Sequence, residues 1–308
     1  MRRGATTRRR GRLARAAVAA LASAVAPGLA SAFDFNAPRV EASITSDDNV
    51  TRAGGSDALR DSILGVRASA GLTQPVSTRT RALVQGFAGG EKFHTYDGLS
   101  HNFIGAQADF QFRSSGEFAA ATYSAFLRTQ AEYFKSTLRD GYRHAYGVTV
   151  LKPLTDRITL LAALQENISD GKSTVFDTKN TALRANFDWS LSTWNTVYLG
   201  AEYRKGDFVT TACRSCDPNK TLGLVNTATP NIIQDDAFTD TVRDAYRLKA
   251  NIVISTLGYN RALGSGQSLD LSWRRAISSL AQSAVAPASK SDFAYTVNQY
   301  SLAYLVRF

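Results

Sequence analysis

The sequence predicts an all-β fold, an antiparallel transmembrane up-and-down β-barrel of about twelve strands that follows a cleaved signal peptide. Three observations predict it. Apolar and polar residues alternate with a period of two, the links between these segments are short and long in turn, and the N-terminus has the features of an export signal. After residue 33 no window of 18 apolar residues occurs, which excludes a helical membrane protein.

The N-terminal segment, residues 1–32, is typical of a signal peptide. An arginine-rich stretch precedes an apolar run over residues 16–30, and an Ala-Ser-Ala triplet ending at Ala32 supplies a cleavage site before Phe33. The run is shorter than the roughly 20 residues of a membrane-spanning helix, and Pro27 interrupts it. Seven of the 36 basic residues lie in this segment, so most of the formal charge of +10 is removable and does not indicate nucleic-acid binding.

Residues 33–308 form the predicted barrel domain. The alternation is clearest in residues 182–190, where Leu183, Phe187 and Trp189 share one face and polar side chains occupy the other. A strand with one apolar face gives this pattern, and a helix does not. Strands are expected near residues 38–46, 60–72, 79–92, 101–112, 118–133, 142–152, 157–168, 181–190, 195–208, 243–258, 267–279 and 292–308.

The links between the strands alternate in length. Short turns are expected at residues 73–78, 113–117, 153–156, 191–194 and 260–266, and longer links at 47–59, 93–100, 134–141, 169–180, 209–241 and 280–291. Short periplasmic turns and long outer loops are typical of transmembrane barrels, and both chain ends then lie on the periplasmic side. A soluble sandwich or lipocalin-like barrel is the alternative. Strands of roughly 9 to 11 residues, with aromatic residues near their ends, favour the membrane.

The chain ends in YSLAYLVRF, and this string resembles the C-terminal β-signal of Gram-negative outer-membrane proteins. Five alternate residues share one face: Tyr300, Leu302, Tyr304, Val306 and Phe308. The resemblance implies location in the cell outer membrane, with outer-membrane lipids, lipopolysaccharide and the barrel-assembly machinery as partners.

A second string, SITSDDNVTRA over residues 43–53, resembles the first hairpin of porin-like barrels, some of which are associated with exopolysaccharide export. In these barrels an Asp-Asn-Val-x-Arg loop follows the first strand. The resemblance covers about one hairpin of this chain, and it implies a role in surface-polysaccharide export or envelope organisation.

If the apolar faces meet lipid, the opposite faces line the lumen. This parity predicts the inward basic residues Arg39, Arg67, Arg81, Arg128, Arg143, Arg184, Arg204, Arg247, Lys249, Arg274 and Arg307. The predicted inward acidic residues are Glu41, Asp109, Glu132, Asp188, Glu202 and Asp270. An excess of one charge sign selects the opposite ion, so the lining predicts a preference for anions. Alternatively, the charges pair across the lumen and stabilise a plugged barrel.

Cys213 and Cys216 form a CxxC in the longest predicted loop. No His follows for haem attachment and no second CxxC completes a zinc site, so a local disulfide is expected. The neighbouring acidic residues Asp47 and Asp48 in the first loop lack the spacing of a calcium-binding loop and are expected to be solvated. We expect no cofactor and no metal.

Catalysis is not expected either. The three histidines, His94, His101 and His144, form no recognisable hydrolase motif. The leading hypothesis is a porin-like channel for passive passage of small anionic solutes. The alternative is a non-channel barrel that supports exopolysaccharide export or envelope organisation through its outer loops. Neither hypothesis involves nucleic acid, and homo-oligomer formation is left open. Large inner side chains, Phe87, Phe126, Leu161 and Tyr198, would have to leave the lumen open for the first hypothesis to hold.

Overall fold

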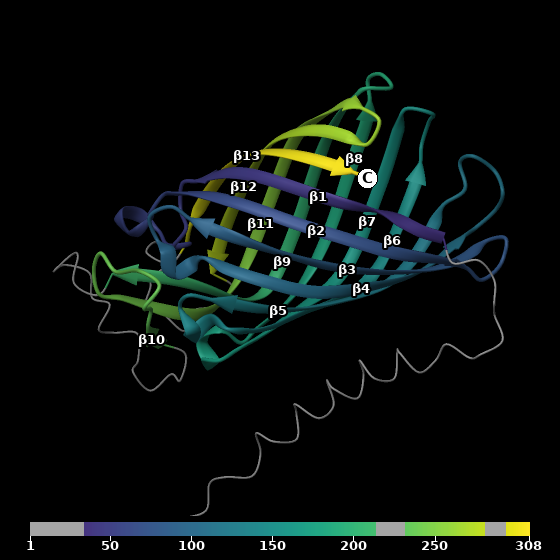
Figure 1. The fold of residues 1–308 in the computed structure, drawn as a ribbon. Coiled ribbons are helices and arrows are strands. Elements are labelled where there is room, and N and C mark those ends of the chain that lie inside the picture. The colour runs from purple at the N-terminus through teal and green to yellow at the C-terminus, as the bar shows by residue number, and fades with distance from the viewer. Residues whose placement is uncertain (1–33, 214–231, 281–293) are drawn as a thin grey trace, which may run out of the picture. The chain divides into compact units, whose positions relative to one another are not determined.

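The computed structural model describes residues 34–213, 232–280 and 294–308, which belong to one antiparallel sheet and its connections. Twelve long strands form a closed ring, because each pairs with its neighbours and β1 also pairs with β13 (Figure 1). The strands are β1 (Asp34–Asp47), β2 (Asp61–Pro75), β3 (Thr80–Phe93), β4 (His101–Arg113), β5 (Thr122–Phe134), β6 (Gly141–Pro153), β7 (Ile158–Gly171), β8 (Thr178–Ser190), β9 (Asn195–Cys213), β11 (Arg243–Gly264), β12 (Gln267–Leu280) and β13 (Thr296–Arg307). The predicted barrel is confirmed.

Two strands are longer than predicted. β9 has 19 residues and β11 has 22, well above the roughly 9 to 11 that cross a membrane at a tilt. Their outer ends remain paired beyond the other strands, from Cys213 opposite Arg243 onwards, and the short strand β10 (Ile232–Gln234) adds to β11 there. The predicted turn at residues 260–266 is therefore wrong. β11 continues to Gly264, and the turn is reduced to two residues, of which Gly266 has a φ of +80° that favours glycine.

The outer surface of the barrel is apolar, as the alternation predicts. Large apolar side chains at alternate positions are exposed, for example Ile44 (55%), Leu64 (55%) and Val84 (52%). On β13, Tyr300, Leu302 and Tyr304 point the same way, and Phe308 ends the chain 74% exposed. Apolar side chains in this number favour contact with lipid rather than water. Recognition of the five C-terminal residues by the assembly machinery stays a prediction.

The two ends of the barrel carry different connections. Short turns join β2 to β3, β6 to β7, β8 to β9 and β11 to β12, whereas β4 and β5 are joined by the longer turn 114–121. At the other end the links contain short 3₁₀ helices, η1 (Gly55–Asp57), η2 (Asp97–Leu99), η3 (Thr137–Arg139) and η4 (Thr174–Phe176). The predicted alternation of short and long links is therefore observed except between β4 and β5, where the link 114–121 is longer than the loop-end links 94–100, 135–140 and 172–177.

No helix among the described residues is long and apolar enough to cross a membrane. The predicted signal peptide, residues 1–32, lies outside the described residues and stays a prediction.

Candidate functional site in the lumen

Side chains that alternate with the exposed apolar residues line the interior. Nine of the eleven basic residues predicted to face inwards lie on this side: Arg39, Arg67, Arg81, Arg128, Arg143, Arg184, Arg204, Arg274 and Arg307. The six predicted acidic residues share it: Glu41, Asp109, Glu132, Asp188, Glu202 and Asp270. Positive charge is therefore in excess on the inner face.

The register of β11 contradicts the predicted inward orientation of two basic residues. Arg247 and Lys249 have the same parity as Val253 and Leu257, which are 51% and 45% exposed on the outer surface. Over residues 246–254 the inner side of β11 is instead apolar, and Tyr246, Ala250 and Ile254 are buried there. Arg247 donates a hydrogen bond to the backbone oxygen of Asp177 in an outer loop, at 2.6 Å. The prediction failed because both faces of β11 carry apolar residues.

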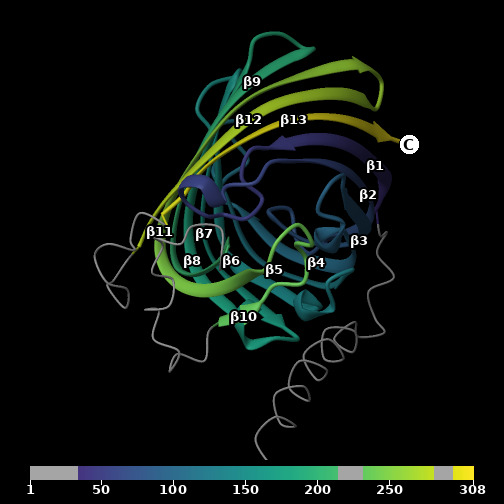
Figure 2. The same cartoon turned by 90° about the vertical axis from the view of Figure 1, so that its left-hand side faces the viewer.

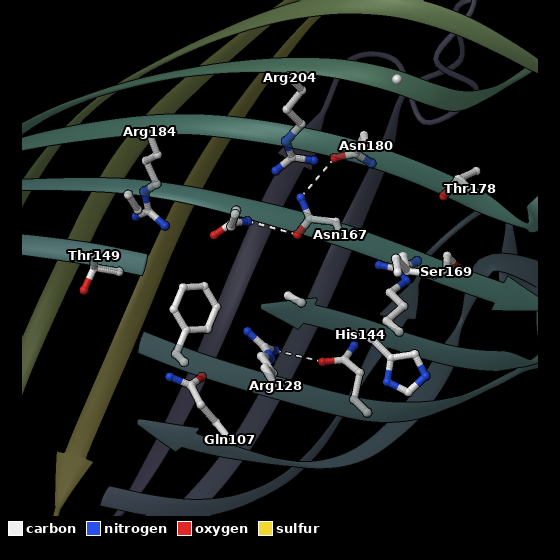
Figure 3. Close-up of a pocket in the computed structure, with 18 of the residues that line it drawn as sticks. Gln107, Arg128, His144, Thr149, Asn167, Ser169, Thr178, Asn180, Arg184 and Arg204 are labelled. Carbon is white, nitrogen blue, oxygen red and sulfur yellow. Dashed lines mark hydrogen bonds between the residues drawn. The ribbon is translucent and has the colours of Figure 1, made fainter. Parts of the chain in front are cut away.

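A cavity of about 960 Å³ occupies the interior between β3 and β11. Arginines and side-chain amides line much of it, and Figure 3 shows Arg128 and Arg184 on opposite sides of this space. The charged and amide residues of the lining include Arg81, Gln107, Arg128, Gln130, Arg143, Gln165, Asn167, Asn180, Arg184 and Arg204. A cavity of this volume is large enough for a small organic molecule, and the amides could supply donors and acceptors for its polar groups.

Some of the inner arginines are paired with carboxylates. Arg143 Nε lies 2.8 Å from Glu132 Oε2, and Arg204 forms an ion pair with Glu202 on its own strand. Glu132 is only 4% exposed, so its negative charge is buried and is neutralised there by Arg143. One pair lies within β9 and the other joins the neighbouring strands β5 and β6, so neither crosses the lumen as the plugged-barrel alternative expects. The net charge of each pair is close to zero.

Other inner arginines are held by neutral groups. Arg128 donates to Gln130 at 2.8 Å, Arg184 to Asn186 at 3.2 Å and Arg81 to Gln111 at 2.7 Å. Within the described parts of the chain, none of Arg81, Arg128 and Arg184 forms an ion pair. The positive charge of these residues is therefore not neutralised by a contacting carboxylate.

The large inner side chains fill only part of the lumen. Phe87 is 4% exposed and packs against two guanidinium groups. Tyr198 donates to Asp270 at 2.8 Å and its ring covers Gly258. Phe126 and Leu161 belong to the lining of the cavity and do not fill it.

Asp47 and Asn49, at the start of the first-hairpin loop (residues 48–60), are buried rather than solvated as predicted, whereas the part of the loop around Gly55 and Ser56 is exposed. Asp47 and Asn49 are 0% and 2% exposed. Arg52 donates two hydrogen bonds to the Asp47 carboxylate, at 2.9 and 2.7 Å, while Asn49 donates to Ala53 at 2.7 Å. Sequence reasoning missed this network, although the Asp-Asn-Val-Thr-Arg string that was noted for its resemblance carries most of it.

A second segment, here called the crossing segment (residues 235–242), lies over the outer end of the barrel (Figure 2). Its Asp235 accepts hydrogen bonds from Thr211 at 2.8 Å and from Arg139 of η3. Its Phe238 packs with Leu99 of η2 in a buried cluster that Val50 of the first-hairpin loop joins. The crossing segment thus connects three outer loops and β9 above the lumen.

Electrostatics around these loops are set by specific partners. Lys135 donates a hydrogen bond to Asp97, and this contact lowers the pKa of the Asp97 carboxyl below its usual value. Burial would raise the pKa of Asp240, but the hydrogen bonds and charge of Arg243 outweigh it and lower that pKa. Both carboxylates therefore stay ionised well into acidic pH.

Of the remaining sequence-predicted residues, His144 lines the cavity, whereas Cys213 and His101 are not part of its lining. Cys213 at the end of β9 is disulfide-bonded, and Cys216, its predicted partner, lies outside the described residues. His144 Nδ1 lies 2.9 Å from Thr129 Oγ1, and the His101 ring stacks on Phe134 with centroids 4.4 Å apart. No group of metal ligands gathers within the described residues.

Comparison with solved structures gives the same fold. An outer-membrane channel of the COG4313 group from Pseudomonas putida F1 matches with a TM-score of 0.52 and 11% identity, over 92% of this chain and 100% of that channel. The chain has the β-barrel fold of that outer-membrane channel. The KdgM porin and the NanC porin match the barrel more loosely, with TM-scores of 0.43, 8% identity and 88% and 87% of this chain covered, and 99% and 100% of theirs. No protein-family model and no curated protein matches the sequence of the barrel.

Proposed function

We propose that this barrel is a porin-like channel for the passive passage of small anionic solutes across the outer membrane. One observation carries the proposal: a cavity of about 960 Å³ whose lining includes Arg81, Arg128 and Arg184, each held by a neutral amide and none by a carboxylate. Uncompensated guanidinium groups in a confined, partly desolvated space attract anions and repel cations.

The test is electrical. The mature protein, refolded and inserted into planar bilayers, is expected to give steady openings whose reversal potential in a KCl gradient indicates chloride preference. Arg184→Gln removes one uncompensated charge and should shift the reversal potential towards potassium. Lys249→Gln, on the outer side of β11, is the matched control and should leave the reversal potential where it was. Cation-selective openings in the wild type would contradict the proposal.

A second candidate rests on the outer loops. The crossing segment and the first-hairpin loop cover the outer end of the barrel and are held by buried contacts such as Asp235 with Thr211. A barrel of this kind would act through its loops in exopolysaccharide export or envelope organisation, without passing solutes. A correctly folded barrel that stays silent in bilayers under all voltages would favour this function over the channel.

A further inference from the structure

The inner faces of β3 and β4 carry a reciprocal arrangement of phenylalanine and glycine. Phe87 lies opposite Gly105, and Phe103 lies opposite Gly89. A Cβ atom on Gly105 would lie 2.6 Å from Phe87 Cζ, and one on Gly89 would lie 2.7 Å from Phe103 Cζ. Each ring therefore occupies the space that a side chain on the facing glycine would need. The spacing is visible in the sequence as Phe-x-Gly repeated on two adjacent strands.

This arrangement lets two arginines meet on one ring. Arg67 reaches Phe87 from β2, and its guanidinium carbon lies 4.4 Å from the ring centroid. Arg128 belongs to β5, two strands from Phe87, and its guanidinium carbon lies 4.7 Å from the ring centroid. A side chain at position 105 would clash with the Phe87 ring and displace it from this position. The glycine thus makes room for the ring that both arginines contact.

An aromatic ring holds a cation without neutralising it. The ring quadrupole attracts a guanidinium group, but the ring carries no net charge. A carboxylate in the same place would cancel the field of the arginine, as Glu132 does for Arg143. Glu41 does face Arg67 across the β1–β2 pair, yet its carboxylate forms an ion pair with Arg39, at 2.9 Å. Arg67 and Arg128 therefore keep two positive charges close together.

We propose that Arg67 and Arg128 set the anion preference of the lumen and that Phe87 is the residue that positions them. The inference rests on the proposed channel function and deepens it. It assigns the anion preference to the two arginines that contact the Phe87 ring, and not to the arginines whose charge is neutralised by carboxylates. Arg128 also lines the cavity, so the charge that the ring holds in place faces the solute.

The first test compares charge variants by reversal potential in a KCl gradient. Arg67→Gln with Arg128→Gln should lower the chloride-to-potassium permeability ratio about fivefold. Lys249→Gln with Arg275→Gln removes the same charge from the outer surface, where both residues alternate with the inner face, and should change the ratio by less than about twofold. Removal of the neutral pair by Glu132→Gln with Arg143→Gln should also have the smaller effect. Equal losses in all three double variants would overturn the inference.

The second test addresses Phe87. Phe87→Leu keeps apolar volume but removes the ring, so the two arginines are freed to reach Glu41 and Glu132. In Phe87→Leu we expect anion selectivity to fall while single-channel conductance changes little. Phe87→Tyr should retain the wild-type selectivity because it keeps the π face of the ring. A Phe87→Leu channel with wild-type selectivity would overturn the positioning role.

A third measurement does not require conduction. Benzene-1,3,5-tricarboxylate should raise the unfolding temperature of the detergent-folded wild type by binding the arginines, and the Arg67→Gln, Arg128→Gln double variant should bind it at least about tenfold more weakly. A silent wild-type barrel would refute the channel function, and this measurement would then decide the inference alone. Equal binding by wild type and variant would refute it.

Discussion

The two ends of the barrel are held together in different ways. At the short-turn end, the turn residues Val76, Phe118 and Leu154 are 59%, 63% and 47% exposed. This end is held together mainly by the backbone hydrogen bonds between neighbouring strands. At the loop end, Asn49 and Ala237 are 2% and 1% exposed, and side-chain hydrogen bonds connect segments far apart in the sequence. The difference indicates that the loop end is a packed unit of its own. Substitutions there should affect stability and access to the lumen, whereas similar substitutions at the short-turn end should not.

The largest expected effect is at Asp47. Asp47→Ala leaves Arg52 without its carboxylate partner and also removes the acceptor for Gln299, at 2.8 Å. Breaking a buried ion pair from one side costs about 3 kcal/mol. Denaturant unfolding of the detergent-folded barrel, followed by tryptophan fluorescence, measures the loss.

The matched control lies near the other end of the same strand. Arg39 pairs with Glu41, but their side chains are 45% and 34% exposed. Arg39→Ala should therefore cost about 0 to 1 kcal/mol. If both substitutions cost the same, the two ends do not differ in the way proposed.

The second prediction concerns the crossing segment. Asp235→Ala removes the acceptor for Thr211 and Arg139 and should destabilise the packing of the segment locally by about 2 kcal/mol. Cleavage by an added protease at residues 235–242 should then be about 30-fold faster, because local opening controls the rate. Digestion at the barrel strands serves as the internal reference. Unchanged cleavage would show that Asp235 does not hold the segment in place.

Steric packing gives a third, smaller contrast between the ends. A Cβ atom on Gly98 would lie 2.5 Å from the Cα atom of Ala237, so Gly98→Ala must displace backbone and should cost about 1 to 2 kcal/mol. Gly116, in the turn between β4 and β5, has no atom within 4 Å of the same position, and Gly116→Ala should be neutral or slightly stabilising. Unfolding midpoints of the two variants check this, and a loss at Gly116 would count against the comparison.

The sequence predicted the barrel well and the loop end poorly, for a physical reason. Strand alternation is a local signal, so strands such as Thr178–Ser190 and the inward position of Arg184 follow from a few neighbouring residues. It fails where both faces of a strand are apolar, and β11 carries Arg247 and Lys249 on the unexpected side for that reason.

The loop contacts depend on partners that no local pattern identifies. Asp47 bonds to Gln299, and Asn49 to the backbone oxygen of Thr296, each about 250 residues away along the chain. The ring contacts of Phe87 likewise need three other strands in register. The Phe-x-Gly spacing was present in the sequence, but its meaning depends on the pairing of β3 with β4.

The smallest effect is expected from the exposed pair of Asp97 and Lys135 at the loop end. Because Lys135 lowers the pKa of Asp97 below its usual 3.8, the folded state binds a proton there less readily than the unfolded state. The stabilisation is therefore present above pH about 4 and is lost as the pH falls through the lowered pKa. Wild type should unfold slightly later than Asp97→Asn at pH 7, and the difference should shrink towards pH 3. Repeating the titration with Lys135→Gln should reduce its pH dependence and leave the smaller part that the hydrogen bond from Ser100 sets. An undiminished pH dependence would show that Lys135 is not the main cause of the shift.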